Sequence, residues 1–222
     1  MKALQHMGPT PNRCAPITYE MLCFIVDTLP PQDYLLYRSM LALGFYGALR
    51  GSEYTAVGDI NGTIRAPVLS QLQFIQFQSS YGLTFTMYTT KTTSQPIVKH
   101  IGCSKHSVCA VCNMVSYLQF KGTTTGLHPK AYLFTDSTGQ PVTKGQLNTI
   151  IKSAVSKLGL PAAGFSTHSL RAGSATSASQ AGFADHEIKT LGHWASDTYN
   201  RYIHKSTQEQ FTYASRIANN HT

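Results

Sequence analysis

The side chains best suited to chemistry are concentrated between residues 165 and 204. His168 and Arg171 are three residues apart in "THSLR", which places them on one face of a helix beginning near Thr167. An imidazole and a guanidinium on one helix face can contact the same ligand. Because a guanidinium carries a permanent positive charge, that ligand is expected to be an anion.

The same segment adds a second imidazole, the chain's only indole and two phenols. His193 and Trp194 are adjacent in "LGHW", and Tyr199 and Tyr202 are three apart. Taken singly, each has an ordinary explanation, since a histidine on a helix usually packs or is solvated and a tyrosine usually packs. Their combination in one segment favours a site in which several polar groups converge.

Composition also favours an anionic partner such as nucleic acid. The chain of 222 residues has 18 Lys and Arg against 10 Asp and Glu, a formal net charge of +8, and a pI near 9.3. Charged residues make up only 13% of the sequence and form no basic run, so the charge alone does not identify the partner.

The sequence gives no sign of a membrane or secreted protein. No stretch approaches the roughly 18 apolar residues that span a bilayer, and the start "MKALQHMGPTPNR" lacks the apolar core of a signal peptide. We therefore expect no membrane partner and no secretion, with a location in the nucleus for a eukaryotic source and in the cytoplasm otherwise.

Helical periodicity accounts for most of the chain. Thr18 can cap a helix over residues 19–29, and a second helix runs toward Gly47, followed by Arg50 at a break before a short helix that Ser52 could cap. Further helices are predicted over the ranges 108–120, 143–160 and 184–192, from Thr167 onward, and after Ser196.

Between these helices the period of the apolar residues changes from helical to alternating. The stretches "LQFIQFQ", "LTFTMYTT" and "PIVKHIG" read as strands, and "TTKTTSQ" as a turn that carries Lys91. The predicted fold class is mainly α with a small antiparallel β-sheet.

Three of the five cysteines cluster between Cys103 and Cys112. Cys103, His106, Cys109 and Cys112 could supply the four tetrahedral ligands of zinc, but a structural pair of CxxC units is absent. The favoured interpretation is a loop entering a helix, with cysteines that pack as small apolar groups, so no metal is expected.

An ordered set of motifs runs through these elements. The motifs occur in this order: Arg50 in "ALRGSE", Lys91 in the turn, "HSLR", "LGHW", and a tyrosine nine residues after the histidine of "LGHW". This set resembles the tyrosine recombinase (phage lambda integrase) family over roughly residues 16–205, and the resemblance implies its catalytic-domain fold. Within the family, "GFYGALRGSE" and "IKTLGHWASDTYNRYI" look most like recombinases of eukaryotic mobile elements such as Cryptons and DIRS-like retrotransposons.

The resemblance implies site residues by position. Arg50 matches the first arginine of the family, Glu53 the acidic residue that usually follows it, and Lys91 the lysine of the β-hairpin turn.

In the later motifs, His168 and Arg171 match the His-x-x-Arg pair. His193, with Trp194 beside it in a supporting position, matches the later histidine, and Tyr202 matches the nucleophile. Tyr199 is the rival nucleophile, and the spacing from His193 favours Tyr202.

The resemblance also implies a mechanism. Arg50 and Arg171 would clamp the nonbridging oxygens of a DNA phosphate, and His168 would accept the proton of Tyr202. Lys91 would protonate the leaving 5′-oxygen, while Arg50, Lys91 and Arg171 would bind DNA. The phosphotyrosine bond preserves the energy of the broken phosphodiester, so no metal, nucleotide or other cofactor is expected.

Two alternatives remain open: a type IB topoisomerase, which shares this chemistry, and a domesticated DNA-binding protein that no longer recombines. The chain divides into a tail over 1–15, a catalytic domain over 16–205, and a tail over 206–222 that can form a helix exchanged between subunits. Family members usually carry a core-binding domain before the catalytic one, and almost nothing precedes residue 16. The expected partners are double-stranded DNA and a homotetramer on paired sites, with a monomer as the alternative for an isolated domain.

Overall fold

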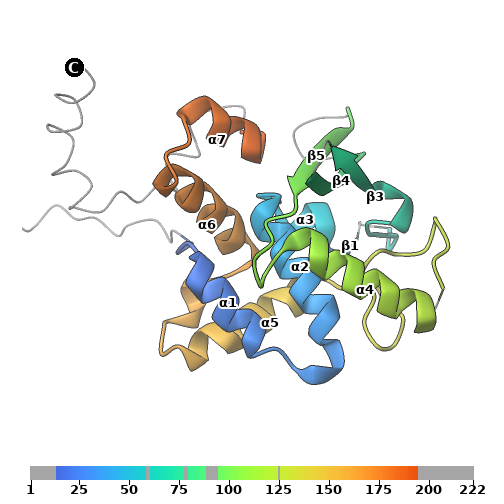
Figure 1. Ribbon diagram of the computed structural model, residues 1–222. Helices are drawn as coiled ribbons and strands as arrows, with labels where there is room; N and C mark the ends of the chain where they lie inside the picture. Colours follow the sequence, from blue (N-terminus) through green and yellow to red (C-terminus); the bar gives the residue numbers. More distant parts are fainter. Residues whose placement is uncertain (1–13, 59–60, 78–79, 89–94, 125, 195–222) are drawn as a thin grey trace, which may run out of the picture.

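The fold is taken from a computed structural model that describes residues 14–58, 61–77, 80–88, 95–124 and 126–194 (Figure 1). Among these residues, no helix combines the length and the apolar character needed to cross a membrane. Lys91 in its predicted turn, the helix after Ser196, the tail over 206–222 and residues 1–13 of the tail predicted over 1–15 lie outside the described residues.

The first two helices lie where the periodicity predicts them. Helix α1 (Tyr19–Asp27) begins after Thr18, whose hydroxyl accepts a hydrogen bond of 3.2 Å from the backbone N–H of Met21. After the 3₁₀ turn η1 (Pro31–Asp33), helix α2 (Tyr34–Tyr46) is buried along most of its length. Helix α2 contacts α1, α4 and α6 and is therefore the centre of the helical core.

Helix α3 (Gly51–Tyr54) corrects one prediction. Ser52 lies inside this helix and does not cap it; Arg50 occupies the N-cap position. The carboxylate of Glu53 accepts the backbone N–H of Arg50 at 2.7 Å, which replaces the hydroxyl cap expected from the sequence.

The alternating stretches form an antiparallel sheet in the order β3-β4-β5, made of β3 (Leu72–Phe77), β4 (Ser80–Met87) and β5 (Ile97–Gly102). In its register, Leu83 of the central strand lies opposite Phe74 on one side and Ile101 on the other. Strand β4 begins three residues earlier than predicted. A separate ladder of β1 (Val57–Gly58) and β2 (Ile64–Arg65) was not predicted.

The remaining helices complete the core. They are α4 (Ala110–Thr124), α5 (Lys144–Lys157), α6 (Thr167–Gln180) and α7 (Asp185–Gly192), with the 3₁₀ turns η2 (Leu69–Gln71) and η3 (Ala162–Gly164). Thr143 caps α5 and Ser166 caps α6, because each hydroxyl accepts an early backbone N–H of its helix.

Figure 1 shows α1 and α5 side by side at one end of the molecule, with the β3-β4-β5 sheet at the other end and α6 and α7 beside it. The fold is thus mainly helical with small antiparallel sheets, as predicted. This arrangement brings α3, β5, α6 and the end of α7 around one region, although they are far apart in the sequence.

Candidate active site

Arg50 stands at the start of α3 and is held by Glu53. The Nη1 atom of Arg50 donates to Oε1 of Glu53 at 2.9 Å, while the other carboxylate oxygen accepts the Arg50 backbone N–H. The Arg50 side chain is 28% exposed and that of Glu53 only 6%. The carboxylate therefore fixes the guanidinium from the protein side and leaves its other donors available to an anion.

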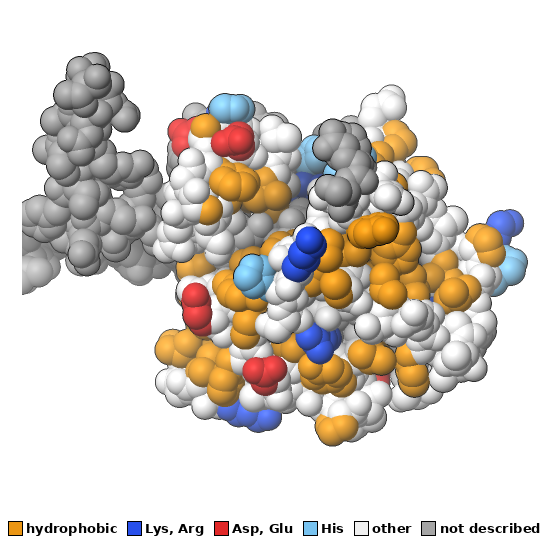
Figure 2. All heavy atoms as spheres, in the orientation of Figure 1, with side chains coloured by type: hydrophobic (Ala, Val, Ile, Leu, Met, Phe, Trp, Pro, Cys, Tyr) orange, Lys and Arg blue, Asp and Glu red, His pale blue; other side chains and the backbone are white. Residues whose placement is uncertain are grey.

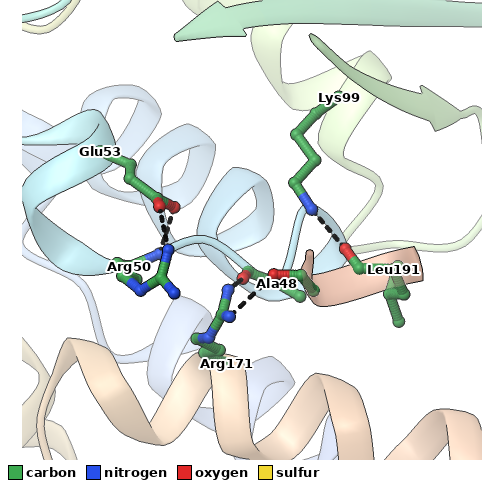
Figure 3. A network of polar contacts seen from close by, with 7 residues as sticks. Ala48, Arg50, Glu53, Lys99, Arg171 and Leu191 are labelled. Carbon is green, nitrogen blue, oxygen red and sulfur yellow. Dashed lines mark hydrogen bonds and ion pairs between the residues drawn. The ribbon is translucent and has the colours of Figure 1, made fainter. Parts of the chain in front are cut away.

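Arg171 reaches the same region from α6 and is 1% exposed. Its Nη1 donates to the carbonyl of Ala48, just before Arg50 in the chain, and its Nη2 donates to the carbonyl of Gly192 at 2.8 Å. Figure 3 shows Arg171 between the α2–α3 connection and the end of α7, with Arg50 beside it. Arg171 thus joins α6 to the end of α7, 21 residues further on, and to the α2–α3 connection, 123 residues earlier.

Trp194 covers the guanidinium of Arg171. The Arg171 Cζ atom lies 4.1 Å from the centroid of the indole, a cation–π contact, and Trp194 packs with Ala48 and Ile188 in a small apolar cluster. Gly192 makes room for the ring, because a Cβ at this position would lie 1.9 Å from Cζ3 of Trp194. The "LGHW" motif therefore holds the end of α7 against α6.

His168 lies in the first turn of α6, one turn before Arg171, and is half-buried. Burial lowers the pKa of His168 below its ordinary value, and the positive charge of Arg171 lowers it further. Lys144 and Arg50 act in the same direction. A neutral imidazole at neutral pH follows, and that is the form that can accept a proton.

His193 follows α7 in the left-handed conformation, with φ of 49°, and its side chain is exposed. Partial desolvation and the positive charge of Lys99 lower its pKa. Glu53 acts in the opposite direction, while Arg171 and Arg50 add to the lowering. His193 is therefore close enough to these groups to share one electrostatic environment.

Lys99 is a member of the site that the sequence interpretation missed. It points inward from β5, is 5% exposed, and donates from Nζ to the carbonyl of Leu191 at the end of α7 (Figure 3). Burial, reinforced by the charge of Arg171, lowers its pKa to about 7. One signal was available: alternation places Lys99 on the same strand face as the apolar residues Ile97 and Ile101.

A cavity of about 620 Å³ opens beside Arg50 and Glu53. Arg65 from β2 and Gln71 also line it, as does Tyr88 directly after β4. Elsewhere, Figure 2 shows Lys and Arg side chains scattered among hydrophobic ones on the face it presents. That face thus carries no broad basic patch among its described residues.

Of the site residues predicted from the sequence, six lie in the described region: Arg50, Glu53, His168, Arg171, His193 and Trp194. The fold brings all of them to the region between α3, α6 and α7. Lys91, Tyr202 and the rival Tyr199 lie outside the described residues, so their positions remain predictions.

Residues 75–209 match the sequence model of the phage integrase family. The chain belongs to this family. The match begins in β3 and therefore excludes Arg50, whereas it includes both histidine motifs and Tyr202. Among curated proteins, none matches this phage integrase family member significantly.

Solved structures share its fold. XerH recombinase bound to palindromic difH substrate, in a post-cleavage complex, superposes with a TM-score of 0.65 at 16% identity, covering 94% of this chain and 53% of XerH. XerA recombinase superposes with a TM-score of 0.61 at 15% identity, covering 92% of this chain and 66% of XerA. The Tn1549 transposon integrase in complex with transposon right end DNA superposes with a TM-score of 0.56 at 16% identity, covering 94% of this chain and 67% of the integrase chain. The chain thus spans about half to two thirds of the length of these structures.

Proposed function

We propose that this chain is the catalytic part of a site-specific DNA recombinase that cleaves and rejoins DNA through a 3′-phosphotyrosine formed on Tyr202. Family membership supports this class of reaction. The DNA-bound structures of XerH and the Tn1549 integrase support double-stranded DNA as the partner. Following the division made from the sequence, the catalytic domain is residues 16–205.

The observation that carries the proposal is unbalanced positive charge at one place. The charges of Arg50 and Arg171 lower the pKa of Lys99 and of both histidines. Glu53 is the one carboxylate among the described groups that raises the pKa of Lys99 and His193. Such a site repels protons and attracts an anion with more than one negative charge. The pentacoordinate phosphorane formed when a phosphodiester is attacked is such an anion.

The proposed cleavage step transfers the DNA phosphate from its 5′-oxygen to Tyr202. His168 accepts the phenolic proton of Tyr202, and the phenolate oxygen forms a bond to phosphorus as the bond from phosphorus to the 5′-oxygen breaks. Arg50 donates hydrogen bonds to a nonbridging oxygen throughout, and His193 donates another. The departing 5′-oxygen takes a proton from a lysine, and rejoining reverses every step without metal or nucleotide.

Arg171 has a double role in this proposal. Its guanidinium donates to the backbone carbonyls of Ala48 and Gly192, so it positions the segments that carry Arg50 and His193. The resemblance to the family also assigns this guanidinium to the phosphate, and a guanidinium with its five donors can bind more than two acceptors.

Two lysines are candidates for the proton donor. Lys91 matches the family's turn lysine, and Lys99 lies in the site with a pKa near neutrality. We assign the proton transfer to Lys91, and we assign to Lys99 the role of holding the end of α7 through the Leu191 carbonyl.

The finer aspects of the assignment are also proposals. The residues around the "ALRGSE" and "LGHW" motifs favour a eukaryotic mobile element of the Crypton or DIRS type, which implies a nuclear location. Recombination between two sites implies a homotetramer on DNA, with residues 206–222 passed between subunits. Type IB topoisomerase activity and DNA binding without cleavage are the competing functions.

Covalent trapping tests the proposal. The protein is incubated with a pool of duplexes that carry a nick and randomised flanking sequence. The short fragment between the cleavage site and the nick, which carries the new 5′-hydroxyl, then dissociates, and rejoining fails. We expect denaturant-resistant adducts on the 3′-end of the cleaved strand, in equal yield with EDTA. Binding without adducts would favour the DNA-binding alternative, and relaxation of supercoiled plasmid without exchange between paired sites would favour the topoisomerase.

A further inference from the structure

Three thiols converge where β5 meets α4, apart from the proposed catalytic site. Cys103 directly follows β5, whereas Cys109 and Cys112 lie at the start of α4. The Sγ atoms of Cys109 and Cys112 each lie 3.6 Å from that of Cys103, and all three lie within 4.8 Å of one another. Sequence spacing brings only two of them together; the third arrives through the fold.

These separations fit the edges of a metal tetrahedron. Zinc binds cysteine sulfur at about 2.3 Å, which places two sulfur ligands of a tetrahedral ion about 3.8 Å apart. The sulfur triangle here already has two edges close to that length. Little rearrangement is needed for a single ion to contact all three atoms.

The burial of the three thiols also suits a bound ion. Cys109 is fully buried, Cys103 is half-buried and Cys112 is exposed, so one side of the triangle opens toward solvent. A metal ion at the centre of the triangle would therefore be enclosed by protein on the side of Cys109 and reachable from solvent on the side of Cys112. Binding of a divalent ion to three cysteines would release their thiol protons, and the charge of the ion would offset the repulsion among the resulting thiolates.

We propose that Cys103, Cys109 and Cys112 bind one zinc ion, with His106 as the fourth ligand. His106 lies in the loop between Cys103 and Cys109, and its exposed ring contacts the edge of Tyr19 with 6.2 Å between ring centroids. Rotation of this side chain away from Tyr19 supplies an imidazole to the open side. Three thiolates and one imidazole in a tetrahedron select zinc over harder cations.

The proposed ion has a structural role that does not depend on the proposed reaction. It would join the end of β5 to the start of α4, and β5 is the strand that carries Lys99. The sequence interpretation of these cysteines as small apolar groups was based on the absence of a second CxxC unit. The fold provides Cys103 in place of that unit.

The first experiment measures metal content. The chain is purified in a reductant that does not bind metal, and zinc is quantified by mass spectrometry after gel filtration. We expect one zinc per chain, and loss of most of it in Cys103→Ser and Cys112→Ser, which are the less buried ligands. Cys23→Ser, at a half-buried cysteine in α1, is the matched control and should keep its zinc. Absence of zinc from the wild-type chain after zinc reconstitution, or equal zinc in all three variants, would overturn the proposal.

A second measurement avoids the risk that a variant unfolds. Cobalt(II) added to the unsubstituted chain should give a thiolate-to-cobalt charge-transfer band and the intense visible bands of a tetrahedral ion, and zinc should displace it. A spectrum of octahedral cobalt, or a disulfide between Cys103 and Cys112 in the chain as purified under reductant, would rule the site out. In His106→Ala, zinc should be lost to a chelator that leaves the parent chain loaded; equal retention would remove His106 from the ligand set.

Discussion

The guanidinium carbon of Arg171 lies 4.1 Å from the centroid of the Trp194 ring, and the same guanidinium donates to the carbonyl of Gly192, two residues before that ring. The Arg171 side chain on α6 thus holds the end of α7 through two contacts, one with the Trp194 ring and one with the Gly192 carbonyl. Because Trp194 is the only tryptophan in the chain, its fluorescence reports directly on this contact.

Gly192→Ala should disrupt this contact. The added Cβ would lie 1.9 Å from Cζ3 of Trp194, so the ring must move off Arg171, at a cost of about 2 kcal/mol in unfolding free energy. We expect a red-shifted emission and a lower midpoint in urea. Gly145→Ala in α5 is the control, since its nearest neighbour would be 3.7 Å away and emission should not change. An unaltered Trp194 spectrum in Gly192→Ala would show that the ring does not pack there.

The two arginines should respond differently to truncation. Arg50→Ala should reduce cleavage by several orders of magnitude with little loss of stability, because Arg50 is 28% exposed. Arg171→Ala should also lose about 3 kcal/mol of unfolding free energy, because it leaves two buried carbonyls without donors. Lysine at either position should restore only part of the activity, since it lacks the planar fork. Cleavage rates and urea melts measure both effects, and full activity in Arg50→Ala would mean that the reaction occurs elsewhere.

Glu53 offers a separate test of how Arg50 is positioned. Glu53→Gln keeps an acceptor for the Arg50 backbone N–H but removes the ion pair, so cleavage should fall less than in Glu53→Ala. The alanine variant should also lose about 1 kcal/mol of stability with the helix cap. Equal cleavage rates in the two variants would show that the cap hydrogen bond contributes nothing to the placement of Arg50.

Lys99 should make stability depend on pH. Its pKa is about 7 in the folded chain against an ordinary value of 10.5, so between these limits the unfolded chain holds a proton that the folded chain lacks. Stability should therefore rise with pH above 7, by up to about 1.4 kcal/mol per pH unit from this group, and the contribution should be lost as pH falls to 7. Urea melts from pH 7 to 9 should show a smaller slope for Lys99→Met. An identical slope would mean that the ammonium is not buried.

Helix positions followed from the sequence because each was specified locally. The apolar spacing in residues 19–46 and the cap Thr18 depend on neighbours within a few residues, and the structure has helices where these signals predict them. The β1–β2 ladder was missed because two-residue strands show no detectable alternation.

The site was only partly predictable for a related reason. The motif order located Arg50, His168, Arg171 and His193, which the fold brings together. The partner of Lys99 could not be predicted, because the Leu191 carbonyl comes from α7, 92 residues further along the chain. Likewise, Cys103 joins the other two cysteines only through the turn between β5 and α4.

Identification of the residue that becomes covalently attached to DNA tests the central claim most directly. Adducts trapped on the nicked duplexes are digested with trypsin and nuclease, and the nucleotide-bearing peptide is sequenced by mass spectrometry. We predict the modification on Tyr202, with adducts absent and DNA binding retained in Tyr202→Phe, and adducts retained in Tyr199→Phe. Modification of Tyr199, or adducts that persist in Tyr202→Phe, would contradict the account.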